Sequence, residues 1–173
     1  MTPPITTSID SPVGTLTLSA SDGFLTRMYM DGQRHAPQEP ADGQRNDGWF
    51  ADIIGQLRAY FDGDLTEFEI PIRLDGTDFQ RGVWAHLRDI PYGETISYGE
   101  LARRVGSPKA SRAVGLANGR NPVSIIVPCH RVIGSNGQLT GYGGGLERKT
   151  WLLDHEAAHR TGGDFQAKLS TRV

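Results

Sequence analysis

The chain has 173 residues, of which 37% are hydrophobic and 22% are charged, and its formal net charge is −2. This composition is typical of a globular protein with an ordinary core and argues against a disordered chain. No stretch approaches the roughly 18 consecutive apolar residues that a membrane span requires, and no signal peptide is evident. The one cysteine excludes an intrachain disulfide and a multi-cysteine zinc site, so we expect a cytoplasmic protein without a metal or cofactor.

The charge is distributed unevenly along the chain. Residues 103–149 contain eight Lys or Arg and one acid, a net charge of +7, whereas the rest of the chain carries −9. A basic segment of this kind favours contact with phosphates, although a solvated surface would have the same composition.

Residues 1–75 predict a small α/β module. Apolar and β-branched residues between turn signals predict a hairpin of strands at 12–19 and 23–30. Residues 34–46 are rich in Pro, Gly and Gln and predict a loop, and helical spacing of apolar residues follows over 49–61. Another strand is expected at 66–74.

We place a domain junction at residues 75–77, followed by a mostly helical module over 76–160 and a mobile tail over 161–173. Helical spacing predicts a helix from Phe79 to Leu87, which Pro91 and Gly93 stop. A last helix is expected to begin near Leu146.

A helix-turn-helix is predicted in this second module. Ser97 and Glu100 form an S-x-x-E capping box, which predicts a helix over 98–105. Gly106 suits the end of that helix, and Pro108 suits the first turn of a second one. Two helices with a short Gly-containing turn form the DNA-binding arrangement, although such pairs also occur in proteins that never touch DNA.

The second helix of this pair consists mainly of Ala, Gly, Ser and Val, with Lys109 and Arg112 as its long polar side chains. That composition suits close approach to a minor groove better than reading of base edges in the major groove. Arg112 is the candidate wedge, with a role as a surface or phosphate-binding charge as the alternative.

Cys129 follows a short apolar run and precedes His130 and Arg131. A cysteine acts as a nucleophile when its thiol is ionised, and an adjacent base or cation favours that ionisation. The side chains of adjacent residues in an extended backbone point to opposite sides. His130 can therefore act on Cys129 only if the chain turns at this point or a water molecule bridges the two side chains. A buried structural cysteine beside a hydrogen-bonded histidine is the alternative.

Glu156 projects between Leu152 and Leu153 on the apolar face of the last predicted helix. A carboxylate on an apolar face needs a partner. One candidate is His130, whose imidazole the carboxylate would orient and help to charge, and the alternative is an arginine. The glycines of residues 141–145 could form a pocket wall with accessible backbone amides, and they do not match a phosphate-binding P-loop.

Motifs between Phe79 and Glu156 resemble the O6-alkylguanine-DNA alkyltransferases, namely PYGETISYGELA, SRAVGLANGRNP, PCHRVIG, LTGYGGGLERK and WLLDHE. The resemblance implies an α+β fold with a ribonuclease-H-like N-terminal module and a winged-helix-like C-terminal module with the helix-turn-helix. Some members of this family carry an N-terminal zinc site, but this chain has no second cysteine, so we expect no such site here.

By this resemblance, Cys129 is the alkyl acceptor, His130 is its base through a water molecule, Glu156 orients that histidine, and Asn121 is the hinge. Arg112 replaces the flipped guanine in the base stack. The remaining implied residues contact the base (Tyr98, Val132, Tyr142 and Gly143) or the DNA (Ser97, Lys109 and Ala110).

The implied activity is direct repair of DNA by one irreversible transfer of an alkyl group from O6-alkylguanine to Cys129, with O4-alkylthymine as a second candidate substrate. The implied partner is double-stranded DNA. The protein is expected to bind it as a monomer, with cooperative assembly along the DNA as a further possibility. Three rival hypotheses are a non-catalytic lesion binder, a transcription regulator and a cysteine hydrolase. The presence of Cys129 disfavours the first.

Overall fold

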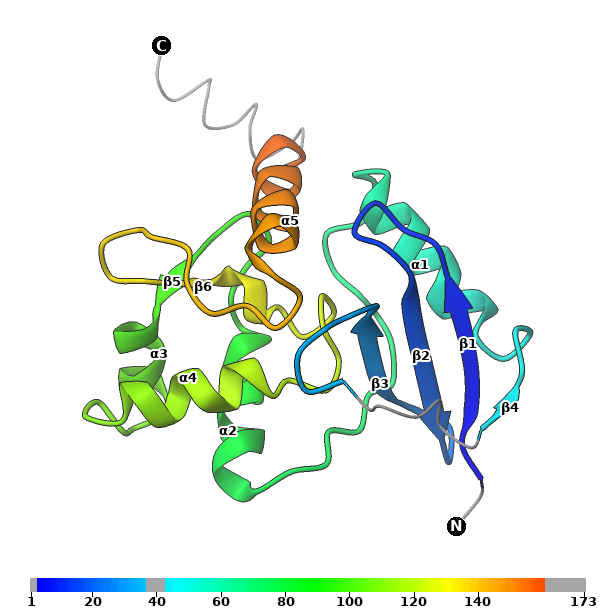
Figure 1. Cartoon of the computed structure of the whole chain (residues 1–173), viewed down its shortest axis with the longest axis horizontal. Coiled ribbons are helices and arrows are strands. Elements are labelled where there is room, and N and C mark those ends of the chain that lie inside the picture. The colour runs from blue at the N-terminus through cyan, green and yellow to red at the C-terminus, as the bar shows by residue number, and fades with distance from the viewer. Residues whose placement is uncertain (1–2, 37–42, 161–173) are drawn as a thin grey trace.

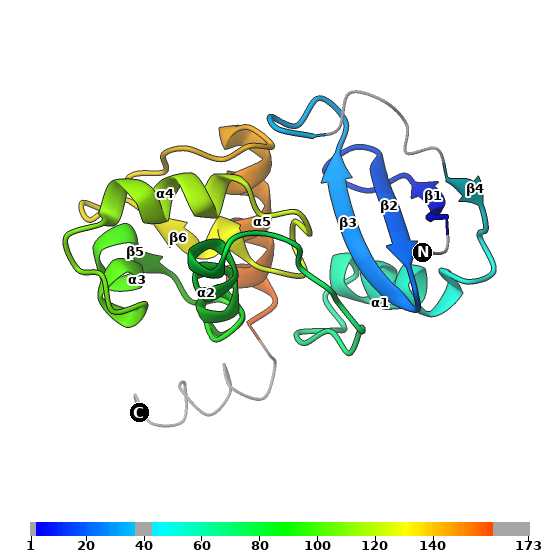
Figure 2. The same cartoon turned by 90° about the horizontal axis from the view of Figure 1, so that it is seen from below.

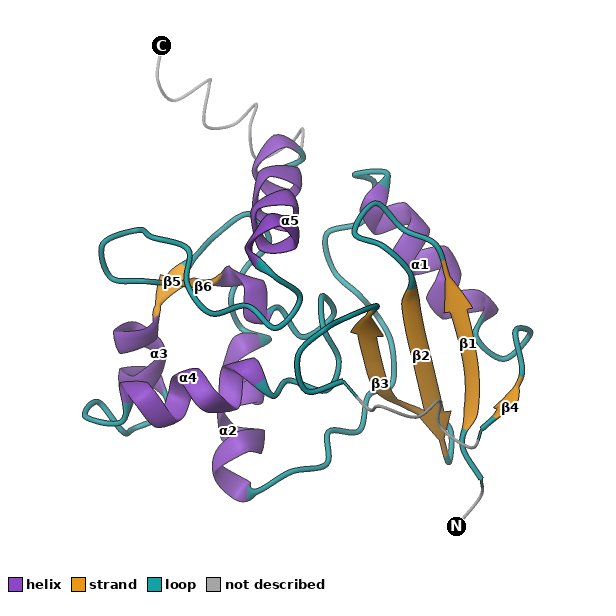
Figure 3. Ribbon diagram, in the orientation of Figure 1, coloured by secondary structure: helices purple, strands orange, loops and turns teal. Residues whose placement is uncertain are grey.

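The computed structural model describes residues 3–36 and 43–160 and has the predicted α+β architecture. A sheet with α1 forms one half of the molecule, and the other helices form the second half (Figures 1 and 3). The predicted tail at 161–173 lies outside the described residues. The elements are β1 (Ile5–Ile9), β2 (Leu16–Ser21), β3 (Phe24–Met30), β4 (Gln44–Arg45), α1 (Ala51–Phe61), α2 (Asp78–Leu87), β5 (Ile96–Ser97), α3 (Tyr98–Arg104), α4 (Ser111–Gly119), the 3-10 turn η1 (Cys129–Arg131), β6 (Val132–Ile133) and α5 (Leu146–Ala158).

The first sheet has the strand order β3-β2-β1-β4, in which β2 is antiparallel to both neighbours and β4 is parallel to β1. The predicted strand at 23–30 is confirmed as β3. The strand predicted at 12–19 begins only at Leu16, because Ser11 and Gly14 close a hydrogen-bonded turn in which Gly14 has φ of 97°. The sequence analysis missed β1.

The prediction of a strand at 66–74 is wrong. Only Ile72 makes a bridge there, to Leu25 of β3, and the remainder of the segment runs along α1 without strand pairing. Gln56 of α1 binds this segment by accepting from Glu69 N at 2.8 Å and donating to Glu69 O at 3.0 Å. A side chain therefore satisfies backbone groups that a neighbouring strand would otherwise bind.

The two halves are joined by backbone hydrogen bonds. Met28 N of β3 donates to Pro122 O at 2.9 Å, and Ser124 N donates to Met28 O at 3.1 Å. The segment between α4 and η1 thus extends the edge of the sheet, as the second view shows from below (Figure 2). Because the buried apolar side chains of both halves form one cluster, the active-site segment is supported from both sides.

The helix-turn-helix is confirmed, with a later start for its second helix. Ser97 Oγ accepts from Glu100 N at 3.0 Å, as predicted, but the Glu100 carboxylate pairs with Arg103 and Arg104, so the reciprocal half of the capping box is absent. Residues 107–110 form a turn, which is why α4 begins at Ser111 rather than near Pro108.

A parallel pair of short strands brings the start of the helix-turn-helix to the segment that follows Cys129. Ile96 pairs with Val132, and Ser97 pairs with Ile133. No helix within the described parts of the chain is both long and apolar enough to cross a membrane.

Candidate active site around Cys129

Cys129 begins the 3-10 turn η1 and is buried, with 5% of its surface exposed. The turn provides the change of direction that the adjacency of Cys129 and His130 requires. The segment Val123 to Val127, called the strap below, is buried along its whole length and mostly apolar, and the thiol follows its end. Ile125 has φ of 73°, a strained conformation for a β-branched residue, which fixes the course of this strap.

Two asparagines hold the strap in place. Asn121 Nδ2 donates to Val127 O at 2.7 Å, and Asn121 Oδ1 accepts from Val123 N at 3.0 Å, so this side chain closes the loop after α4. Asn118 Nδ2 donates to Cys129 O at 3.3 Å. Both asparagines are buried, and they connect α4 directly to the residue that carries the thiol.

The carboxylate of Glu156 is fully buried and lies at the centre of a hydrogen-bond network. His130 Nε2 donates to Oε2 at 2.7 Å, and Arg131 donates through Nε to Oε1 at 2.7 Å and through Nη2 to Oε2 at 3.0 Å. Tyr60 of α1 donates its hydroxyl to Oε2 at 2.7 Å, and Gly93 N approaches Oε1 at 3.4 Å. Both partners considered from the sequence, the histidine and an arginine, therefore bind the same carboxylate.

This network determines the ionisation of its members. Burial acts to raise the pKa of Glu156, but the hydrogen bonds from His130 and Arg131 and the charge of Arg131 hold that pKa well below its usual range. Burial lowers the pKa of His130, against the opposing charge of Glu156. The ring is therefore neutral at pH 7, with its proton on Nε2 and with Nδ1 able to accept one.

Lys149 is a functional candidate that the sequence analysis did not identify. It is fully buried on α5, and its Nζ donates to Val132 O at 2.6 Å and to Thr140 O at 3.0 Å. Burial lowers its pKa to about 8. Burial also raises the pKa of the Cys129 thiol, whereas a hydrogen bond from Asn121 and the charge of Lys149 lower it. The ammonium thus favours the thiolate.

The four residues expected around the base lie on three segments near Cys129. Val132 follows η1 and is buried, and Tyr142 and Gly143 belong to the glycine loop. Tyr98 begins α3, where its hydroxyl donates to Thr140 O at 3.1 Å and its ring lies 5.8 Å from Lys149 Nζ. Tyr98 therefore connects the glycine loop to the helix-turn-helix.

Buried polar atoms without a hydrogen-bond partner gather at this site. Within the described residues they include Asn118 Oδ1, His130 Nδ1 and the Tyr142 hydroxyl. The pKa of Tyr142 is raised by burial and by the neighbouring Cys129 thiol, which places the two groups near each other. Because buried polar groups are costly to leave unpaired, these atoms indicate a site that a ligand or water completes.

Most of the basic residues in the 103–149 segment already have an acidic partner or are buried. Five of the eight are paired or buried, namely Arg103 and Arg104 with Glu100, Arg131 with Glu156, Arg148 with Asp31, and the buried Lys149.

The other three, Lys109, Arg112 and Arg120, are exposed and form no ion pair within the described residues. Lys109 lies in the turn before α4, Arg112 in the first turn of the helix, and Arg120 directly after its last residue. The charge available for phosphates is therefore concentrated at this helix. Ser97 and Ala110, also expected at the DNA, are half-buried at the starts of α3 and α4, and the exposed Leu116 lies on the outer face of α4.

Tyr60, Asn118 and Lys149 carried no sequence signal strong enough to identify them. Tyr60 fits the apolar spacing of its helix, and Lys149 was counted as one of the surface charges. Only the folded structure brings them to Cys129 and Glu156. Within residues 3–36 and 43–160, no three His, Cys, Asp or Glu side chains are grouped to hold a metal ion.

Replacing Tyr60 with Phe should lower the free energy of unfolding by about 2 kcal/mol, because a buried hydrogen bond to an ionised carboxylate is lost. Denaturant unfolding at pH 7 measures the change. Tyr92→Phe is the matched control, since its hydroxyl is buried without a partner among the described residues. Equal losses in the two variants would contradict the role given to Tyr60.

Replacing Glu156 with Gln should lower the free energy of unfolding at pH 7 by about 3 kcal/mol or more, because Arg131 loses its charged partner. The depressed pKa of Glu156 stabilises the fold above the unfolded value of about 4.5, and this contribution is lost as pH falls below it. The difference between wild type and variant should therefore shrink in acid. Unfolding over a pH series tests this, with the exposed Glu67→Gln as control; a pH-independent difference would contradict it.

Family models match nearly the whole described chain. Residues 5–74 match the ribonuclease-like domain of 6-O-methylguanine DNA methyltransferase, and residues 78–158 match its DNA binding domain. A methylated-DNA--protein-cysteine methyltransferase of Mycolicibacterium paratuberculosis is 55% identical over 152 residues, which cover 88% of this chain and 92% of the relative. One from Methanosarcina acetivorans is 48% identical over 150 residues, which cover 86% and 96% of the two chains.

Solved structures agree with the sequence comparison. The structure of Mycobacterium tuberculosis O6-methylguanine methyltransferase has 51% identity and a TM-score of 0.85, over 92% of this chain and 96% of that one. A structure of Mycobacterium tuberculosis OGT in complex with DNA has 52% identity and a TM-score of 0.84, over 90% and 94% of the two chains. The chain belongs to the 6-O-methylguanine DNA methyltransferase family.

Proposed function

We propose that this protein repairs DNA by transferring the alkyl group of O6-alkylguanine to Cys129. The observation that carries the proposal is the arrangement of the chain's one cysteine, buried next to a neutral histidine whose other ring nitrogen is bound by an ionised glutamate. The family membership supports the substrate class, since its relatives are methylated-DNA--protein-cysteine methyltransferases.

The buried thiol requires the damaged base to leave the DNA helix. Flipping a base costs a few kcal/mol of stacking and pairing, and less when the base is damaged. The helix α4 approaches the minor groove with its small residues, and the exposed Arg112 fills the gap in the stack. Asn118 and Asn121 connect this helix to the thiol, so binding at α4 positions the base at Cys129.

The transfer step uses groups that surround the thiol. His130 takes the thiol proton at Nδ1 through a water molecule, while Glu156 stabilises the resulting imidazolium. The thiolate attacks the alkyl carbon, a C–S bond forms, the C–O bond breaks, and its electron pair remains on guanine, which takes a proton. Tyr98 is the proposed donor that offsets charge on the leaving base, with its hydroxyl turned from Thr140 O towards the base, and Lys149 stabilises the thiolate.

The base pocket is formed by Val132, Tyr142 and Gly143 together with Tyr98. The carbonyls of Cys129 and Val132 are the proposed acceptors for the guanine amine. The Val132 carbonyl accepts from Lys149 Nζ and keeps a lone pair, whereas the Cys129 carbonyl already accepts from Asn118 Nδ2 and Val132 N and would share its lone pairs with the base. The Tyr142 hydroxyl and the Gly143 amide are the proposed donors to the alkylated oxygen.

The product is a thioether on Cys129, and the proposed mechanism contains no step that breaks its C–S bond. Each molecule therefore acts once. We further propose that the protein binds DNA as a monomer that can assemble cooperatively along the duplex, and that residues 1–75 and 76–160 act as two domains. Ser97, Lys109 and Ala110 are proposed as additional DNA contacts.

Incubation with duplex DNA containing O6-methylguanine should add one methyl group per protein molecule, on the peptide that contains Cys129. Intact-mass and peptide mass spectrometry measure this, and Cys129→Ser should show no transfer. Repeated turnover would indicate a hydrolase instead, and binding of the lesion without a mass change would indicate a lesion binder.

Replacing Arg112 with Ala should slow repair of duplex DNA by about tenfold or more, because the stack is left unfilled, and should leave the reaction with free O6-benzylguanine base unchanged. Single-turnover rates on both substrates measure the difference. Arg81→Ala, an exposed arginine paired with Asp78 on α2, is the control. Equal losses on the two substrates would refute the proposed role of Arg112.

A further inference from the structure

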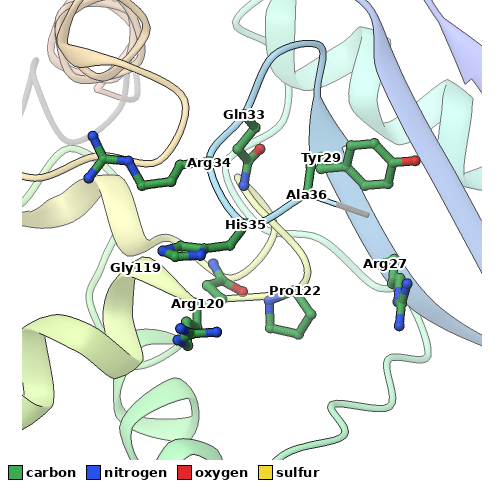
Figure 4. Close-up of a pocket in the computed structure, with 10 residues that line it drawn as sticks. Arg27, Tyr29, Gln33, Arg34, His35, Ala36, Gly119, Arg120 and Pro122 are labelled. Atoms are coloured by element: carbon green, nitrogen blue, oxygen red, sulfur yellow. The ribbon is translucent and has the colours of Figure 1, made fainter. Parts of the chain in front are cut away.

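A cleft of about 290 Å³ lies where the sheet meets the end of α4 (Figure 4); of the residues assigned to the alkyl-transfer site it is lined only by Asn121, and its described lining does not include Cys129, His130 or Glu156. One wall comes from β3 and the loop that follows it, and the other from the segment after α4. The lining residues include Arg27, Tyr29 and His35 on the first wall and Gly119, Arg120 and Pro122 on the second.

The cleft is basic. Among residues 3–36 and 43–160, its lining contains arginines and a histidine and no Asp or Glu. Arg27, His35 and Arg120 are exposed, and none of them forms an ion pair with any residue in the ranges 3–36 and 43–160. Figure 4 shows His35 and Arg120 on the side of α4 and Arg27 projecting from the strand, whereas Arg34 points away from this group. Unneutralised guanidinium groups at a concave surface favour an anion.

The walls of the cleft are fixed with respect to each other. Met28 N donates to Pro122 O at 2.9 Å, which links β3 to the second wall. Gln33 accepts from Met30 N at 2.9 Å and donates to Ser124 Oγ at 3.1 Å. The cleft is therefore preformed, and an anion bound in it would not have to order its two sides.

His35 has an unusual backbone conformation. Its φ of 64° lies in the left-handed region that non-glycine residues rarely adopt. Gln33 N donates to Met30 O, and Ala36 N donates to Gln33 O at 3.2 Å, so the tight turn around it is hydrogen-bonded. Strain of this kind often marks residues whose position is functional, and here it holds the imidazole at the cleft.

The cleft continues the outer face of α4. Arg112, Leu116 and Arg120 are spaced four residues apart and exposed, so they form one stripe along the helix. At a rise of 1.5 Å per residue, Arg120 lies roughly 12 Å beyond Arg112 along the axis. A DNA strand that follows this stripe reaches the cleft at the end of the helix.

We propose that this cleft binds a phosphate group of the DNA backbone, held by Arg27, His35 and Arg120. The proposal rests on the proposed function insofar as α4 contacts DNA. It gives the N-terminal module a direct share in DNA binding, through Arg27 and His35, without a part in the alkyl transfer. A free phosphate ion has the same chemistry, and the experiment separates the two sources.

The test uses the full chain with Arg27→Gln, His35→Ala and the double variant Arg27→Gln/Arg120→Gln. Arg58→Gln is the matched control, because Arg58 is exposed on α1 and lines a separate hollow beside β1. Fluorescence anisotropy measures affinity for a long undamaged duplex over a series of salt concentrations. The reaction with free O6-benzylguanine shows that each variant keeps a folded active site.

We expect the double variant to bind DNA about tenfold more weakly and Arg58→Gln to bind as wild type does. The slope of log affinity against log salt should fall by about 1 for each lost phosphate contact. A duplex truncated to the footprint of α4 should show no loss for Arg27→Gln. Wild-type affinity and slope in the Arg27 and His35 variants would overturn the proposal.

Adding inorganic phosphate distinguishes a phosphate of the DNA backbone from a free phosphate ion as the ligand of the cleft. If it shifts the His35 ring signals in NMR and competes with DNA for the cleft, the backbone phosphate is supported. If it binds while the variants keep normal DNA affinity, the cleft takes free phosphate and the proposal is overturned. If the cleft proposal fails but the wild-type protein still transfers the alkyl group, the proposed function stands. If the wild-type protein transfers no alkyl group, the proposed function is rejected, and this result does not count against phosphate binding in the cleft.

Discussion

The buried carboxylate of Glu156 is the group on which the rest of the structure depends. Removing an ionised carboxylate from water costs several kcal/mol even after relaxation, so the fold must surround it with donors. It does so with His130, Arg131, Tyr60 and Gly93, which come from three segments far apart in the sequence. The energetic need of one side chain thus fixes the mutual positions of η1, α1, α5 and the loop after α2.

This requirement also connects the two halves of the molecule. Tyr60 belongs to the helix that covers the N-terminal sheet, yet its hydroxyl binds the carboxylate that orients the base of the active site. The edge of the same sheet is hydrogen-bonded to the strap that ends at Cys129. The N-terminal module therefore supports the Cys129 site directly, and we propose a second role for it, at the DNA, through the basic cleft at its edge.

Ion pairing decides which charges are left for DNA. The sequence contains a strongly basic segment, but the fold uses Arg131, Arg148 and Lys149 internally. Within the described part of the chain, the exposed arginines of this segment without an acidic partner are Arg112 and Arg120, both at α4, so a slightly negative net charge is compatible with a local positive surface. A chain with a net charge of −2 can therefore present a basic face to a duplex.

The sequence by itself determined the elements with strong local signals, including β3, α1, α2, α3 and α5, and the proximity of the one thiol to a histidine. It also placed Glu156 on an apolar helix face. The tertiary structure alone decided the partners of Glu156 and the burial of Lys149, because these depend on contacts between distant segments. It also decided that residues 66–74 form no strand, since Gln56 satisfies backbone groups that a neighbouring strand would have bound.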